Sequence, residues 1–335
     1  MPHPIRLAVV GAGIFARDAH LPALLAQPDR FEIVALYSRT RANAEALAEK
    51  FALRADISTD LDALLARPDI DAVDLLLPIE ALAPAVEQAL RAGKHVISEK
   101  PIAPDVATGE RLLGLYANYP QQVWMVAENW RYEQAFAAAA EIVQRGDLGT
   151  IYAADWALYI PVLPGNKYYH TDWRRSGTFP GGFLLDGGVH HVAVLRQTLG
   201  EIASVSAQVK QMRPDLPPAD TLSAALEFER GLLGAYTVTY GAGASWANAL
   251  HVVGERGALR VDRGLVELFL GGEPLPALTF DNSSVNHELT AFADAVQRGQ
   301  AHRNTPEQAL QDVAVVEAML ESAESGRRVQ PKRFV

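Results

Sequence analysis

The sequence of 335 residues contains no cysteine. Without thiols the protein has no disulfide bonds, no Cys-ligated zinc and no cysteine nucleophile. The sequence also lacks an excess of positive charge, since 30 Lys and Arg face 40 Asp and Glu and the formal net charge is −10. No basic cluster stands out that would follow a phosphate backbone, so we predict no binding to nucleic acid.

Long apolar runs are missing as well. The chain passes from Met1 almost directly into a strand-like segment, without the stretch that a signal peptide or a membrane span requires. We therefore predict a soluble, cytoplasmic protein that does not bind membranes. The acidic and histidine residues form no recognisable ligand set, so no metal site is predicted.

The sequence does contain enough apolar residues for two hydrophobic cores. Hydrophobic residues make up 49% of the chain, and its length exceeds the usual size of a single domain. Strand-like runs alternate with helical patterns up to Ala127, among them a helix expected from Pro84 to Ala92, and this alternation predicts a parallel sheet. The β-rich segments that follow are joined by short glycine turns and predict a mainly antiparallel sheet.

The first strand-like run, residues 5–10, leads into a glycine loop. Gly11 permits a tight turn and Gly13 lets a pyrophosphate approach the backbone, while Ile14 and Phe15 complete the loop. Alanine replaces the third glycine of the dinucleotide fingerprint. Because strand, glycines, helix and a second strand follow in the required order, the pattern favours a nicotinamide cofactor site over a purely structural turn.

The end of that second strand decides between the two nicotinamide cofactors. An acidic residue there binds the free ribose 2′-hydroxyl, but this chain has Ser38 and Arg39 instead. A hydroxyl beside a guanidinium suits a 2′-phosphate, so we predict NADP in preference to NAD, with NAD still possible. The alternative is that both residues are an ordinary helix cap and helix surface.

Lys100 follows another buried strand, within the stretch Ser98-Glu99-Lys100-Pro101. Ligands of open parallel sheets bind at the carboxyl ends of the strands, which is where this lysine is expected. There it could donate a proton or polarise an oxygen. Taken alone, a lysine at a strand end is more often a solvated loop charge.

The chain resembles the Gfo/Idh/MocA family of nicotinamide-dependent oxidoreductases along almost its whole length. The resemblance is carried by an ordered set of motifs: the loop at residues 11–13, residues 92–101, 145–149, Trp173-Arg174, residues 181–190, residues 254–259 and Thr305-Pro306-Glu307. It implies a Rossmann domain at residues 1–127 and a substrate-binding α+β domain at residues 128–304, whose large open sheet would form a homodimer. The C-terminal helix and tail, residues 305–335, are expected to pack back on the Rossmann domain.

The same resemblance implies the catalytic residues Lys100, Asp186 and His190. If the segment around Asp186 is helical, His190 projects from the same face one turn later. His190 would then be a general acid/base for a substrate hydroxyl or carbonyl, Asp186 would orient it or bind a neighbouring hydroxyl, and Lys100 would stabilise alkoxide charge. The alternative for His190 is a hydrogen-bonded packing histidine.

Further residues are predicted to contact the substrate or the cofactor. Asp186 and His190, together with Tyr169, Trp173 and Arg174 in a stretch dense in aromatic and polar residues, are expected to bind substrate, although such a loop could equally be stabilised by its own packing. The predicted cofactor contacts outside the glycine loop are Ser38, Arg39, Pro78, Glu99, Lys100 and Asn129. After Pro78 the Asn-x-x-His of many family members is absent.

These observations lead to an NADP-dependent dehydrogenase or reductase that acts on a sugar, a polyol or a related hydroxy or oxo compound. A regulatory protein that keeps the fold and binds NADP without catalysis is the alternative, because function does not follow from fold. Glycoside cleavage through transient oxidation by a retained NAD is a further possibility, which Ser38 and Arg39 disfavour.

Overall fold

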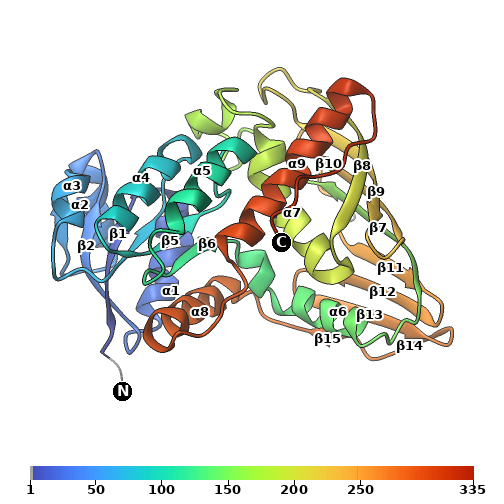
Figure 1. The fold of residues 1–335 in the computed structure, drawn as a ribbon, viewed down its shortest axis with the longest axis horizontal. Coiled ribbons are helices and arrows are strands. Elements are labelled where there is room, and N and C mark those ends of the chain that lie inside the picture. Colours follow the sequence, from blue (N-terminus) through green and yellow to red (C-terminus); the bar gives the residue numbers. More distant parts are fainter. Residues whose placement is uncertain (1–2, 247) are drawn as a thin grey trace. The chain divides into compact units, whose positions relative to one another are not determined.

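The computed structural model of the protein describes residues 3–246 and 248–335, which form two compact units (Figure 1). Unit 1 comprises Met1–Glu128 and Val285–Leu310. Unit 2 comprises Asn129–Ser284 and Gln311–Val335. Among the described residues, no helix is both long and apolar enough to cross a membrane.

Unit 1 is built on a six-stranded sheet with the order β3-β2-β1-β4-β5-β6, and every pairing is parallel. The order reverses between β1 and β4, which is the topological switch point of a doubly wound fold. This arrangement confirms the predicted Rossmann sheet. The strands are β1 (Ile5–Val10), β2 (Phe31–Tyr37), β3 (Asp56–Ser58), β4 (Ala72–Leu75), β5 (His95–Glu99) and β6 (Trp124–Ala127).

The connections between these strands are helical, as the sequence predicts. Aspartate side chains cap two of the helices, Asp60 accepting from the Ala63 N–H and Asp105 from the Thr108 N–H. The helical segments are η1 (Ala16–His20), α1 (Leu21–Leu25), α2 (Arg41–Lys50), α3 (Leu61–Leu65), α4 (Ile79–Arg91) and α5 (Val106–Tyr116).

Helix α4 begins five residues before the predicted start at Pro84, which lies inside it. The reason is burial, since Ile79 and Leu82 are 2% and 0% exposed and the additional turn places both in the core.

A segment from the second half of the chain completes unit 1. In helix α8 (Ser284–Arg298), Leu289 and Phe292 are fully buried in the same core as Leu7 and Leu24. The predicted second domain ran to residue 304, so the boundary differs from the structure. The physical reason is that the apolar face of α8 is buried by distant strands, which its local pattern cannot indicate.

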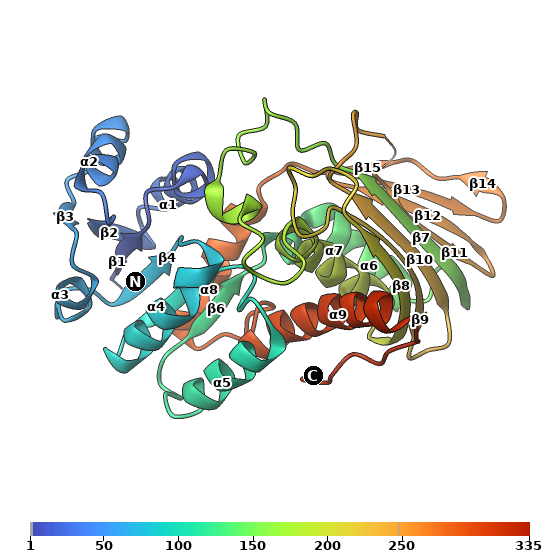
Figure 2. The same cartoon turned by 90° about the horizontal axis from the view of Figure 1, so that it is seen from above.

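Unit 2 contains a nine-stranded sheet, with β14-β13-β12-β11-β7-β10-β9-β8 in order and β15 paired with β13. The pairing is mainly antiparallel, as predicted, but β7 and β10 are parallel. Helices α6 (Gln134–Gln144), α7 (Phe183–Leu199) and α9 (Pro306–Ser325) lie on one side of the sheet (Figure 2). The strands are β7 (Ile151–Tyr159), β8 (Ile202–Lys210), β9 (Thr221–Phe228), β10 (Leu233–Thr239), β11 (Leu250–Gly254), β12 (Gly257–Asp262), β13 (Leu265–Leu270), β14 (Glu273–Pro274) and β15 (Leu278–Thr279).

The C-terminal segment was predicted to pack back on the Rossmann domain, but from Gln311 onward it belongs to unit 2. Its anchor is Asp312, which is 1% exposed and forms ion pairs at 2.5 Å with both Arg131 and Arg196. Val329 then bridges to Val205 of β8. Removing either guanidinium would leave buried charge without its partner, so these ion pairs fix the segment to unit 2.

The interior of unit 1 holds an acidic cluster, which consists of Asp74, Glu99, Glu128 and Glu288. Burial raises the pKa of Glu288 well above its ordinary value, and the charges of Glu128, Glu99 and Asp74 raise it further. The protonated, neutral form of Glu288 is therefore favoured in the folded protein, and Asn304 Nδ2 donates to its Oε1 at 2.9 Å.

This raised pKa predicts how Glu288→Gln changes stability with pH. Below its ordinary value of 4.5 the group is protonated in both the folded and the unfolded states. Between that pH and the raised pKa of the folded state, only the unfolded carboxyl ionises, so the wild type loses stability while the glutamine variant does not. The advantage of the variant in unfolding free energy should grow with pH by up to about 1.4 kcal/mol per pH unit. Urea unfolding between about pH 5 and about pH 8 measures it. Exposed Glu49→Gln is the control, and a constant difference would contradict the assignment.

Candidate active site

The glycine loop after β1 has the geometry that a dinucleotide requires. Gly11 has a φ of +121°, and a Cβ there would lie 2.3 Å from the Leu76 carbonyl oxygen, so only glycine fits. A Cβ on Gly13 would meet nothing within 4 Å, which leaves open space against the backbone. A helix begins at Ile14 and continues through Phe15 into η1. The loop and this helix N-terminus fit a pyrophosphate.

The end of β2 carries the residues predicted to select the cofactor. Ser38 is buried, and its Oγ accepts from the Thr40 N–H at 3.3 Å. Arg41 is held by Glu45 at 2.9 Å. Arg39 is exposed and has no ion-pair partner among residues 3–246 and 248–335, so its guanidinium is available to a ligand.

The other predicted residues of unit 1 lie at the same edge of the sheet, because the carboxyl ends of parallel strands meet there. Pro78 is the N-cap residue of α4. Glu99 ends β5, and its Oε2 accepts from the Lys100 backbone N–H at 3.2 Å. The fold thus brings the glycine loop, Ser38, Pro78 and Lys100 to one edge.

Asn129 begins unit 2, where it is 8% exposed and its Nδ2 donates to Ser284 Oγ at 2.9 Å. Its placement beside the nicotinamide remains a prediction, and in this structure its amide donates to the serine that begins α8.

Asp186 and His190 lie one turn apart on α7, which confirms that this segment is helical. Asp186 is 8% exposed, and its Oδ2 accepts from Arg174 Nε at 2.8 Å. The His190 ring stacks on the Trp130 ring, with centroids 5.1 Å apart and an angle of 14° between the planes. A carboxylate paired with a guanidinium and an imidazole held by stacking form an ordered polar group.

The loop before α7 holds Arg174 through its aromatic residues. The guanidinium lies over the rings of Tyr168 and Trp173, at 4.8 and 4.1 Å from their centroids. Tyr169 donates its hydroxyl proton to Asp215 at 2.8 Å. Arg174 and Asp186 are therefore brought together, whereas the Tyr169 hydroxyl is occupied by a carboxylate. Substrate binding by Tyr169 and Trp173 remains a prediction.

Sequence reasoning missed two aromatic residues at this site, Trp130 and Tyr240. Tyr240 is 4% exposed, and its Oη has no hydrogen-bond partner among the described residues. Burial raises the pKa of Tyr240, and the charge of Asp186 adds to the rise. The phenol therefore stays protonated as a donor. Gly187 was the available signal, since a glycine inside a helix often marks the close approach of another group.

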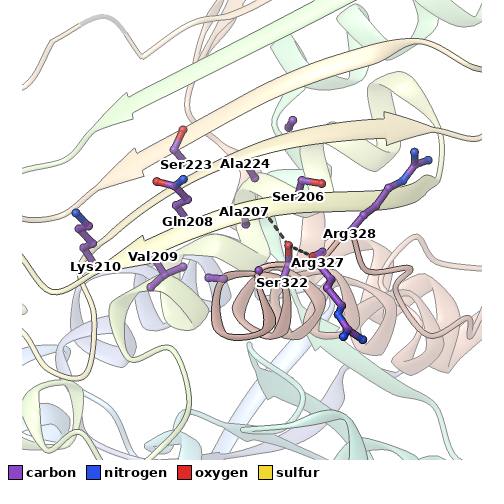
Figure 3. Close-up of a pocket in the computed structure, with 13 residues that line it drawn as sticks. Ser206, Ala207, Gln208, Val209, Lys210, Ser223, Ala224, Ser322, Arg327 and Arg328 are labelled. Carbon is purple, nitrogen blue, oxygen red and sulfur yellow. Dashed lines mark hydrogen bonds between the residues drawn. The ribbon is translucent and has the colours of Figure 1, made fainter.

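A separate pocket of unit 2 lies against β8, β9 and the C-terminal end of α9 (Figure 3). Ser206, Gln208 and Ser223 line it, with Lys210, Arg327 and Arg328 spread along its length rather than converging on one point (Figure 3). It includes neither Asp186 nor His190, so it lacks the chemistry of the α7 site. In the described part of the chain, no group of three or more His, Asp or Glu could hold a metal ion.

Two matching domains identify the family of this protein. The oxidoreductase family with an NAD-binding Rossmann fold matches residues 5–127, and the C-terminal alpha/beta domain of that same family matches residues 140–330. The chain therefore belongs to the Gfo/Idh/MocA family of oxidoreductases, which confirms the resemblance inferred from the motifs.

Individual relatives agree with this membership. An oxidoreductase from Thermotoga maritima has the same fold over 98% of both chains, with a TM-score of 0.92 and 38% identity. Dehydrogenase FPY6 of Fusarium mangiferae is 33% identical, covering 95% of this chain and 96% of the relative. The dTDP-3,4-didehydro-2,6-dideoxy-alpha-D-glucose 3-reductase of Streptomyces violaceoruber is 31% identical, covering 88% and 86%. The protein is accordingly an NAD(P)-dependent enzyme of the dehydrogenase and reductase class.

The contact between α7 and Tyr240 predicts opposite effects for two neighbouring substitutions. A Cβ on Gly187 would lie 1.8 Å from Tyr240 Oη, so Gly187→Ala should destabilise the protein by about 1–3 kcal/mol through overpacking. A Cβ on Gly188 would meet Val316 at an ordinary 3.5 Å, so Gly188→Ala should stabilise the helix by about 0.5–1 kcal/mol. Urea unfolding compares the pair, and similar shifts for both variants would refute the contact.

Proposed function

We propose that this protein is an NADP-dependent oxidoreductase that transfers a hydride between the nicotinamide and a carbon bearing a hydroxyl or carbonyl group in a sugar, a polyol or a related compound. The observation that carries the proposal is the ordered group on α7, where Asp186 is paired with Arg174 and His190 is stacked on Trp130. The third residue of the proposed trio is Lys100, which follows β5 at the carboxyl edge of the unit 1 sheet.

Each residue of the trio has a role that its chemistry supports. The imidazole of His190 exchanges the proton of the substrate hydroxyl. The ammonium of Lys100 stabilises the charge that develops on the same oxygen. Asp186, held in place by Arg174, orients the imidazole or accepts a neighbouring substrate hydroxyl. The bound nicotinamide supplies or accepts the hydride.

The preference for NADP rests on the end of β2. Arg39 is exposed and available, whereas Arg41 is held by Glu45. The strand ends in Tyr37 and is followed by Ser38 and Arg39, so this position has no acidic side chain to bind a free 2′-hydroxyl. A guanidinium is the group best suited to a 2′-phosphate.

The substrate class is supported by two observations. The relative from Streptomyces violaceoruber carries a name that describes a reductase of a nucleotide-linked deoxysugar. In this chain, carboxylate, imidazole and guanidinium groups gather around α7, and a molecule with several hydroxyl groups could use them as hydrogen-bond partners.

We also propose a homodimer formed through the face of the unit 2 sheet opposite α6 and α7. On β9 and β10 that face exposes Ser223, Ala225, Leu233 and Ala235, and Ser223 hydrogen-bonds to Thr237 across the strands at 2.9 Å. A face with small side chains and an exposed leucine can bury apolar surface against a second sheet. The cytoplasmic location stays a prediction from the sequence.

The roles of the trio predict a loss of turnover that is not additive. Lys100→Met should lower kcat/KM by roughly 10³-fold, because alkoxide charge is no longer stabilised, while NADPH affinity stays within about threefold. His190→Asn should have a comparable effect, and the double variant should be little worse than the poorer single one. Exposed Lys50→Met is the control. Full activity of Lys100→Met would refute the assignment, and NADPH binding without turnover of any carbonyl compound in a broad panel would favour a regulatory role.

The cofactor preference predicts an effect confined to NADPH. Arg39→Ala should weaken NADPH binding by about 10- to 100-fold, as expected for losing a hydrogen bond to a charged group, and leave NADH binding nearly unchanged. Arg41→Ala, which removes an arginine that already pairs with Glu45, is the matched control. Quenching of tryptophan fluorescence measures both cofactors. Equal affinity of the wild type for NADPH and NADH would overturn the proposal that Ser38 and Arg39 favour NADP.

A further inference from the structure

Two carboxyl groups of the acidic cluster of unit 1 face a buried base, His20. His20, Asp74 and Glu288 are 0% exposed, and Glu128 is 2% exposed. These side chains come from η1, β4, α8 and the residue that follows β6, with Glu99 at the end of β5. The predicted fingerprint and the proposed trio do not use His20, Asp74 or Glu288.

The imidazole of His20 lies between two carboxyl groups. Its Nδ1 is 2.8 Å from Asp74 Oδ2, and its Nε2 is 3.9 Å from Glu99 Oε1. Burial alone lowers the pKa of His20, but the charge and hydrogen bond of Asp74, together with the charge of Glu99, outweigh burial and raise that pKa. The ring is thereby fixed at one end by Asp74 and directed at Glu99 with the other.

Glu99 in turn contacts the backbone of Lys100. One carboxyl oxygen of Glu99 faces His20, and the other accepts from the Lys100 N–H at 3.2 Å. A short chain of contacts therefore runs from β4 through the imidazole to the lysine. Asp74 anchors it in the centre of the parallel sheet.

The remaining members of the acidic cluster are Glu288 and Glu128. Burial and the charges of Glu128, Glu99 and Asp74 raise the pKa of Glu288, on α8. Asn304 donates to Glu288 Oε1 and also to the Glu128 backbone carbonyl, at 2.9 and 3.0 Å. Both shifts favour the protonated forms of Glu288 and His20, and the imidazole of His20 lies between Asp74 and Glu99.

We propose that His20 is a positioning residue for Lys100, because its imidazole, anchored by Asp74, faces the Glu99 carboxyl group that receives the Lys100 N–H, so that a positive charge on the ring acts on the lysine through that carboxyl group. The proposal rests on the proposed role of Lys100 in the reaction. It assigns to His20 no contact with substrate or cofactor.

Chemical labelling of Lys100 tests the proposal without requiring turnover. Acetylation by an N-hydroxysuccinimide ester consumes neutral amines, and peptide mass spectrometry gives the rate at Lys100 relative to exposed Lys50 in the same chain. Asparagine in place of His20 can still donate to Asp74 but carries no charge toward Glu99. In His20→Asn the rate ratio should fall several-fold, because losing a nearby positive charge favours the ammonium form.

A purely structural role of His20 predicts the opposite change in the labelling ratio. If His20 only supported packing, its loss would expose Lys100 and raise the ratio, so an unchanged or raised ratio overturns the proposal. His95→Asn is the matched control: His95 begins β5, at the opposite end from Glu99, and its Nδ1 accepts from the Val123 N–H at 2.9 Å. The ratio in this variant should equal that of the wild type.

Kinetics separate this proposal from the proposed function. In His20→Asn, kcat should fall about tenfold with NADPH affinity unchanged, and the alkaline limb of the pH profile should move to higher pH. Loss of turnover in Lys100→Met, together with a wild-type labelling ratio and pH profile in His20→Asn, would overturn the role of His20 alone. Unchanged turnover in Lys100→Met would overturn the proposed function, while the labelling ratio still decides whether His20 acts on Lys100.

Discussion

Parallel pairing of the six strands of unit 1 is the constraint on which the candidate site depends. Because parallel strands end at one edge, residues far apart in the sequence meet there: the Gly11 turn after β1, Ser38 after β2 and Lys100 after β5. The reversal of strand order between β1 and β4 opens that edge to a dinucleotide. Gly11 is held so close to the Leu76 carbonyl that no side chain fits, which fixes the turn.

The charged residues on α7 and those of the acidic cluster in unit 1 are stabilised in different ways. On α7 each polar group has a fixed neighbour, Arg174 for Asp186 and Trp130 for His190. Behind Lys100, by contrast, carboxyl groups from distant strands and helices are brought together in a buried region. The raised pKa of Glu288, which favours its neutral form, and the imidazole of His20 between Asp74 and Glu99 make this grouping possible.

Much of this could be predicted from the sequence. The Rossmann sheet, the mainly antiparallel second sheet and the helix that carries Asp186 follow from periodicity and glycine positions, which are local signals. What local patterns cannot show is which distant partner covers an apolar face. This is why α8 was assigned to the second domain and the segment after Gln311 to the first. For the same reason local patterns did not predict Tyr240 as a site residue, since only the fold brings its hydroxyl against Gly187.

The proposed reaction moves a hydride between a nicotinamide and a carbon of a hydroxylated small molecule. The most direct measurement is isotope transfer, in which the enzyme is incubated with NADPH deuterated at the transferred position and a panel of keto sugars, and the products are examined by mass spectrometry. The account predicts a reduced product that carries the deuterium, formed by the wild type and not by Lys100→Met. Tight NADPH binding with no deuterated product from any member of the panel would contradict it.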